Sequence, residues 1–208
     1  MNKRIIASAL LLLNGLLWTN TAMATEEPKY DVIKTDGAFE IRRYKPMLIA
    51  ETEVQGDMDE ASRKGFRLIA DFIFGNNERP DSPEASKIAM TAPVTAQPLT
   101  SDTNMQTADK WRVQFLMPSQ YTLATIPKPK NNEVRLKEVP SKYFVVLSYS
   151  GLNGVAKVQE KTNEAIQWTL KNGLEMIGSP QLARYDPPWT LPMFRRNEIV
   201  LEVLAPKQ

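Results

Sequence analysis

The side chains that could carry acid–base or metal chemistry are restricted here, because the sequence contains neither histidine nor cysteine. Histidine is the commonest metal ligand and the usual proton carrier near neutral pH. Because histidine and cysteine are both absent, Ser-His and Cys-His catalytic pairs are excluded. No histidine or cysteine ligand is available for zinc, copper or haem iron either. We therefore expect no structural metal. The remaining acid–base candidates are carboxylates such as Glu40, Glu51 and Glu53, and their spacing singles out no catalytic pair.

The segment Arg184–Glu198 indicates a different chemistry, the binding of an apolar molecule. Its prolines exclude a helix interior or a central strand, so we predict a semi-rigid loop. Large exposed apolar groups usually mark a binding surface. The alternative is a loop that folds over the end of the sheet and plugs the core with its aromatic rings. The loop contains Tyr185, Pro187, Pro188, Trp189, Pro192, Met193 and Phe194.

A second unusual segment is Lys87–Val94, which we predict to be a strand. Pro93 cannot donate to a ladder, so it belongs at an edge or a bulge. Ala89, Met90 and Ala92 are small or flexible, as a surface that admits a flat ligand would be. The alternative is an ordinary edge strand with Met90 in the core, and spacing alone favours this alternative.

These segments must be held by regular elements, which the first half of the chain predicts clearly. Asp57 precedes Met58 as an acidic N-cap, with Glu60 three residues on, and Gly75 follows the apolar stripe as a helix stop. Strands are predicted at residues 30–33, 39–44 and 47–54, and a polar loop at 76–86. The helical stripe consists of Met58, Ala61, Gly65, Ile69 and Phe72, widened by Phe66 and Ile73.

The second half repeats this plan. Strands are predicted at 111–117, 133–139 and 143–149, followed by a helix at 155–171 that ends at Asn172-Gly173. Matching short motifs recur at offsets of 93 to 98 residues, which favours a duplicated strand-strand-helix-strand unit. We therefore predict an α+β fold, a distorted antiparallel β-barrel flanked by two main helices.

The N-terminus is typical of a secretory signal peptide. Lys3 and Arg4 precede the apolar stretch Ile5–Trp18, and Ala22-Met23-Ala24 offers a cleavage site after residue 24. A transmembrane anchor is the weaker alternative, because a spanning helix needs about 20 apolar residues. The prediction is a signal peptide at 1–24 and a single domain at 25–208, periplasmic or secreted, with no stable membrane span after cleavage. The sequence does not predict an oligomeric state.

Removal of the signal peptide changes the charge. The full chain has 26 basic and 24 acidic residues, and two of the basic ones, Lys3 and Arg4, leave with the signal. The mature part would then be neutral. Since nucleic-acid binding needs a concentrated positive face, we expect no nucleic-acid partner.

Several motifs together resemble the SOUL haem-binding family. They are Glu40-Ile-Arg-Arg-Tyr44, the run from Gly65 to Ile73, Ile88-Ala-Met-Thr-Ala-Pro-Val94, Arg184-Tyr-Asp-Pro-Pro-Trp189 and Arg195-Arg-Asn-Glu198. The resemblance extends from about Glu27 to Leu204. It implies a distorted barrel of duplicated units with two helices. It also implies a haem or other porphyrin ligand, bound in an apolar surface cleft beside the first helix and near the loop before the last strand.

Carried onto this sequence, the resemblance implies a ligand site on that helix and that loop, and Arg63 would pair with a propionate. No histidine is present to ligate iron, and Asp71 stands where some relatives have a second basic residue. If iron is ligated, the candidates are Tyr185, Met90 and Met193. The predicted ligand-binding residues are Arg63, Phe66, Ile69, Ala70, Ile73, Met90, Tyr185, Pro188, Trp189 and Met193.

Three functions follow from these observations. The leading one is a non-catalytic binder or carrier of haem or a related tetrapyrrole, a hydrophobic small molecule, held without histidine ligation. The second is an enzyme that acts on a tetrapyrrole or small hydrophobic ligand, with carboxylates as its acid–base groups. The third is an envelope protein-binding module that uses the Pro-Trp loop.

Overall fold

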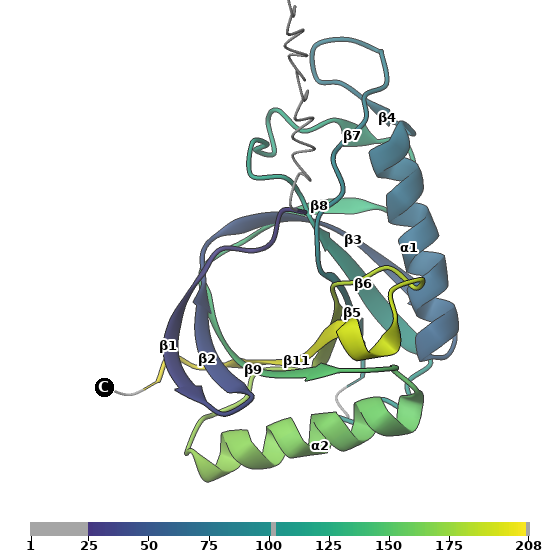
Figure 1. The fold of residues 1–208 in the computed structure, drawn as a ribbon. Helices are drawn as coiled ribbons and strands as arrows, with labels where there is room; N and C mark the ends of the chain where they lie inside the picture. The colour runs from purple at the N-terminus through teal and green to yellow at the C-terminus, as the bar shows by residue number, and fades with distance from the viewer. Residues whose placement is uncertain (1–24, 101–102, 207–208) are drawn as a thin grey trace, which may run out of the picture.

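A computed structural model describes residues 25–100 and 103–206. The predicted signal peptide lies outside these residues. In the described part no helix is long and apolar enough to cross a membrane. Nine strands form one antiparallel sheet that curls into a half-barrel, and two helices lie against its outer side (Figure 1). The α+β barrel-like fold is thus confirmed. The helices are α1 (Met58–Phe74) and α2 (Val155–Lys171), with a short 3-10 helix η1 (Pro192–Phe194).

The order of strands in the sheet is β1-β2-β9-β11-β10-β5-β6-β3-β8, and β4 and β7 form a separate small ladder. The bounds are β1 Tyr30–Asp36, β2 Phe39–Tyr44, β3 Met47–Gln55, β4 Asn77–Glu78, β5 Val94–Pro98, β6 Lys110–Leu116, β7 Lys128–Pro129, β8 Arg135–Val139, β9 Lys142–Ser150, β10 Gln181–Arg184 and β11 Arg196–Val203.

The sheet order displays the predicted duplication directly. Exchanging β2 with β8, β3 with β9, β5 with β10 and β6 with β11 reverses the order and leaves every pairing intact, with β1 added at one edge. β3 and β9 are both nine residues long, and each is followed by a glycine with positive φ, Gly56 or Gly151, and then by a 17-residue helix. The repeated unit therefore contains one strand more than the predicted strand-strand-helix-strand.

The helix α1 begins and ends where the sequence predicts. The Asp57 carboxylate accepts hydrogen bonds from the backbone amides of Asp59 and Glu60, and Gly75 provides the C-cap. The predicted stripe packs on β3 and β6, whereas Phe66 at its margin remains 38% exposed. Gly65 is required by close approach, since a Cβ there would lie 2.5 Å from the Val113 side chain.

The prediction of a strand at Lys87–Val94 is wrong except for its last residue. The chain from 87 to 93 makes hydrogen bonds outside the main sheet, because Ile88 N donates to Ile73 O and Ala92 N donates to Glu26 O. The sheet is joined only at Val94, the first residue of β5. The predicted loop at Arg184–Glu198 ends earlier than expected, because residues from Arg196 onward belong to β11. The prolines of this segment exclude regular pairing only in the part that precedes Arg196.

Candidate functional site

One flank of α1 carries three of the predicted ligand residues. Arg63, Phe66 and Ala70 follow Asp59 at helical spacing and lie to one side of the buried stripe. Arg63 is exposed, Ala70 is 8% exposed, and the ring centroid of Phe66 lies 5.6 Å from that of Phe115 on β6. This flank therefore offers an apolar strip with one cation at its outer side.

The segment that contains Met90 runs close to the same flank. It starts at Ile88, which is bonded to Ile73 of α1, and ends at Val94, which pairs with Phe115. Met90 itself is 41% exposed, so it is not the core residue of the alternative interpretation. Its thioether is available at the surface near this flank.

Ile69 and Ile73 point the other way. They are 0% and 1% exposed and belong to the core cluster between α1 and the sheet. In this conformation they support the strip from below, and a ligand on the surface would not touch them.

The loop between β10 and β11 presents its apolar side chains to solvent. Trp189 is 83% exposed and Met193 is 67% exposed, and Pro188 is exposed as well. The Arg195 guanidinium donates to the backbone oxygens of Thr190 and Pro188, which makes the loop compact. The aromatic side chains thus do not plug the core. A hollow of about 290 Å³ lies at the base of η1, lined by Ser148–Ser150 and Met193–Arg196.

The loop and the helix flank are tied together at the loop's root. Arg184 is the last residue of β10, and its Nη2 lies 3.3 Å from Oδ1 of Asp59 in the first turn of α1. Burial lowers the pKa of Arg184, and the charge of Asp59 opposes that effect. Figure 1 shows the yellow loop next to the lower half of α1. The two parts of the predicted site are therefore neighbours.

Tyr185 lies on the opposite face of the sheet, inside the half-barrel. Its hydroxyl donates to Glu198 Oε2 at 2.6 Å, and Glu198 is 2% exposed. The same carboxylate accepts from Arg42 Nη1 and Nη2 at 3.1 Å and from Ser148 Oγ at 3.2 Å. Tyr44 completes the cluster by accepting from Arg42 Nη1 at 3.2 Å.

This buried cluster affects the chemistry available to Tyr185. Burial, followed by the negative charge of Glu198, raises the pKa of the Tyr185 hydroxyl far above its ordinary value. Iron ligation by tyrosine needs the phenolate. Tyr185 is thus both turned away from the helix flank and held in its neutral form.

The three carboxylates considered for catalysis are all held by cations. Glu40 pairs with Arg42 at 2.6 Å, Glu51 lies 3.7 Å from Arg112, and Glu53 pairs with Lys110 and Arg112 at 3.2 and 3.1 Å. Among the described residues no group of three acidic side chains could hold a metal ion.

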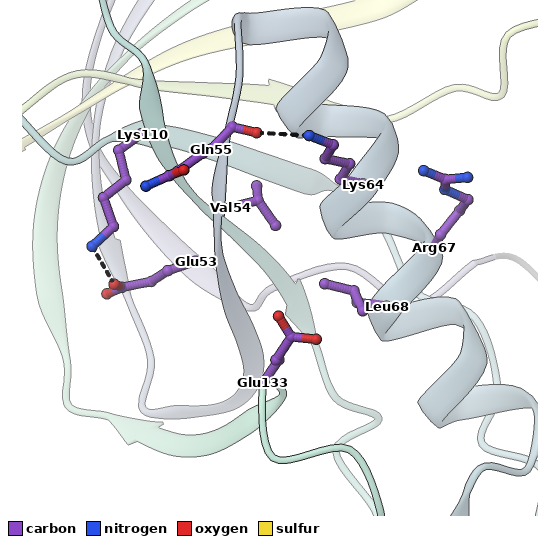
Figure 2. A pocket seen from close by; sticks show the side chains of 8 residues that line it. All are labelled: Glu53, Val54, Gln55, Lys64, Arg67, Leu68, Lys110 and Glu133. Atoms are coloured by element: carbon purple, nitrogen blue, oxygen red, sulfur yellow. Dashed lines mark hydrogen bonds and ion pairs between the residues drawn. The ribbon is translucent and has the colours of Figure 1, made fainter.

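A feature that the sequence analysis missed lies on the other flank of α1. A hollow of about 600 Å³ separates this flank from the end of β3 (Figure 2). The helical spacing of Lys64, Arg67 and Leu68 is visible in the sequence. Whether a hollow forms beside them depends on the residue at which β8 ends. The lining residues are Glu53, Val54, Gln55, Lys64, Arg67, Leu68, Lys110 and Glu133.

Comparison with known proteins agrees with the fold. The model of the family described as SOUL heme-binding protein matches residues 25–202. No curated protein matches. Similar solved structures include the EcmrR C-terminal domain, at 12% identity with a TM-score of 0.60, covering 84% of this chain and 98% of that one. A hydrolase from Listeria innocua is similar at 15% identity with a TM-score of 0.52, covering 83% and 94%. At these identities the structures show a shared fold.

Proposed function

The chain belongs to the SOUL heme-binding protein family, and on that premise we propose that it binds a tetrapyrrole between the flank of α1 and the β10–β11 loop. The ligand would be haem or a related porphyrin, held reversibly by its apolar ring. Family membership suggests the ligand class. The position of the site is our inference from the side chains described above.

One observation carries this position. Arg184 fastens the root of the loop to the first turn of α1. The loop that carries the exposed Trp189 and Met193 therefore leaves the sheet beside the apolar strip that contains Phe66. Leu191 and Phe194 of the same loop are exposed as well, and a group of exposed apolar side chains usually marks a binding surface.

The physical chemistry of a porphyrin suits such a surface. Burial of apolar area contributes about 25 cal/mol per Å², so covering roughly 200 Å² contributes about 5 kcal/mol without a bond to iron. Arg63 is exposed at the edge of the strip, where its guanidinium could hold a propionate in bidentate fashion.

Iron ligation plays a secondary part in this proposal. Tyr185 is engaged with Glu198, which leaves the thioethers of Met90 and Met193 as the exposed candidates from our set. Recognition of the ring rather than of the metal therefore fits these residues best. A carrier or buffer of tetrapyrroles needs release as well as capture, which ring contacts permit.

The location of this activity is also a proposal. The signal-like residues 1–24 would direct the chain out of the cytoplasm, and the mature protein would begin at Thr25. Mass spectrometry of the protein recovered from the periplasm tests this directly. A chain that keeps its first 24 residues would contradict it.

The site is tested by titrating hemin into the mature protein and into Trp189→Ala and Arg63→Ala. Each variant should weaken binding about tenfold, the loss of roughly 1.4 kcal/mol. The matched control is Arg79→Ala, an exposed arginine outside α1 that pairs with Asp81, which should bind as the unmodified protein does. Unchanged affinity in both site variants would place the ligand elsewhere.

A further inference from the structure

The tip of the β10–β11 loop is apolar and uncharged. Residues 187–194 read Pro-Pro-Trp-Thr-Leu-Pro-Met-Phe and contain no acidic or basic side chain. Leu191 is 58% exposed and Phe194 is 70% exposed, so they join Trp189 and Met193 at the surface. Large apolar side chains gathered in this way mark a surface that another apolar phase or a partner covers.

The loop also bonds much of its own backbone. Its three prolines carry no N–H group. The amides of Thr190, Phe194 and Arg195 donate to carbonyl oxygens within the loop at 2.9–3.1 Å. The Arg195 guanidinium takes two further carbonyls, those of Thr190 and Pro188. Backbone groups that enter an apolar phase must be bonded internally, so this loop can leave water at a low cost.

The base of the loop carries positive charge. Arg184 and Arg196 are each paired with an acidic side chain, and Asp186 accepts from the Arg196 amide at 2.6 Å. In residues 25–100 and 103–206, however, no carboxylate lies within ion-pair distance of Arg195 or of Arg63 on the neighbouring flank of α1. Two cations without a carboxylate partner thus lie below an uncharged tip.

These features fit a lipid bilayer better than a protein partner. A protein interface has about one hydrogen bond per 100–200 Å², whereas Thr190 and the indole N–H of Trp189 are the only polar side-chain groups of the tip. A bilayer requires no directional bonds from the groups that enter it. Tryptophan is enriched at the headgroup level, and anionic lipids attract cations next to it.

From this arrangement we propose that the loop docks the ligand-free protein on an anionic lipid bilayer. Leu191 and Phe194 enter the boundary between headgroups and acyl chains, Trp189 lies at the headgroup level, and Arg195 faces lipid phosphates. Docking goes beyond the proposed tetrapyrrole binding and does not rest on it. It would place the α1 flank beside the phase in which an apolar ring dissolves.

The first test is sedimentation of the haem-free mature protein with vesicles of equal parts phosphatidylcholine and phosphatidylglycerol. The protein should bind, and at least about fivefold more weakly to phosphatidylcholine alone. Leu191→Ser and Phe194→Ser should each weaken binding about tenfold. The matched control is Leu170→Ser, which should bind normally. Leu170 is 61% exposed in the last turn of α2, which ends beside β1, where Lys34 donates to Asn172.

The second test reads the depth of Trp189 in the bilayer. The other tryptophans of residues 25–208 are shielded, since Trp111 is 0% exposed and Trp168 is stacked on Phe39. Lipids brominated near the headgroup end of the acyl chain should therefore quench Trp189 more strongly than lipids brominated near the methyl end. Trp189→Phe should still sediment with the vesicles and should lose the quenching.

Four results would overturn the proposal. They are no sedimentation at millimolar lipid, an equal loss in Leu170→Ser and Leu191→Ser, binding without quenching of Trp189, and self-association of the protein that Leu191→Ser abolishes. The last result would assign the loop to a second copy of the chain. Because the vesicle assay contains no haem, a failed hemin titration does not affect it. Leu191→Ser and Phe194→Ser should bind hemin normally, since neither residue belongs to the proposed ligand set.

Discussion

Arg184 and Asp59 lie 125 residues apart in the sequence, and their side chains meet at 3.3 Å between the end of β10 and the first turn of α1. The contact joins the second repeat to the first at the point where the apolar loop leaves the sheet. We propose that it directs the loop toward the flank of α1 with Phe66 and Arg63.

The first prediction concerns this contact. Arg184→Met should weaken tetrapyrrole binding severalfold, because the loop is no longer held beside the helix, while the far-UV circular dichroism stays the same. Hemin titration measures the effect. Arg79→Met is the control, since Arg79 pairs with Asp81 in an exposed loop. Equal affinities in Arg184→Met and the unmodified protein would show that the contact does not position the loop.

The buried pair of Arg42 and Glu198 leads to a second prediction, on stability. Removing one partner leaves the other charge buried, which typically costs about 3–5 kcal/mol. Arg42→Met should therefore lower the free energy of unfolding by an amount of this order in urea denaturation. Changing both residues to methionine should recover part of the loss. Lys157→Ala, which breaks the exposed pair with Glu160, is the control and should change stability much less. A similar loss of stability in Arg42→Met and in the lysine control would contradict this prediction.

Tyr44 provides a prediction on pH dependence. Burial raises the pKa of its hydroxyl to about 12 from the ordinary 10.0. The folded protein holds this proton longer than the unfolded chain, so the contribution of Tyr44 is complete below pH 10 and is lost as the pH rises toward 12. The free energy of unfolding should fall over this interval. Tyr44→Phe should make the fall shallower, and an unchanged slope would indicate that Tyr44 ionises normally.

Gly65 provides a prediction on packing. An alanine there would bring its Cβ within 2.5 Å of the Val113 side chain, so α1 would have to move away from β6. Overpacking of this kind typically costs about 1–3 kcal/mol. Gly154→Ala is the matched control, because a Cβ at that position meets nothing within 4 Å. Chemical denaturation of both variants measures the difference, and equal stabilities would argue against the close approach.

The sequence predicted the elements with local signals accurately. Asp57 and Gly75 carry capping chemistry, and the α1 stripe carries helical periodicity, so the bounds of the helix could be read directly. The duplicated motifs predicted the repeat, because they too are local patterns of the sequence. The segment 87–93 could not be predicted, because its hydrogen bonds go to Glu26 and Ile73, and no local pattern encodes those partners.

The candidate site was predicted less completely, also for a physical reason. The resemblance placed Ile69 and Tyr185 in one ligand set, but a helix and a strand each direct neighbouring residues to different sides. Ile69 lies in the core and Tyr185 inside the half-barrel, whereas Arg63 and Trp189 remain at the surface. The hollow between α1 and the end of β3 was not predicted, since it depends on the residue at which β8 stops pairing.

The central claim is that the tetrapyrrole ring, rather than its iron, is recognised. The most direct test is to titrate hemin and metal-free protoporphyrin into the mature protein and to follow the Soret absorbance. Saturable binding of both, with dissociation constants in the micromolar range or tighter and within about threefold of each other, is the predicted result. A protein that gives no saturable change with either compound, or that binds hemin alone, would contradict it.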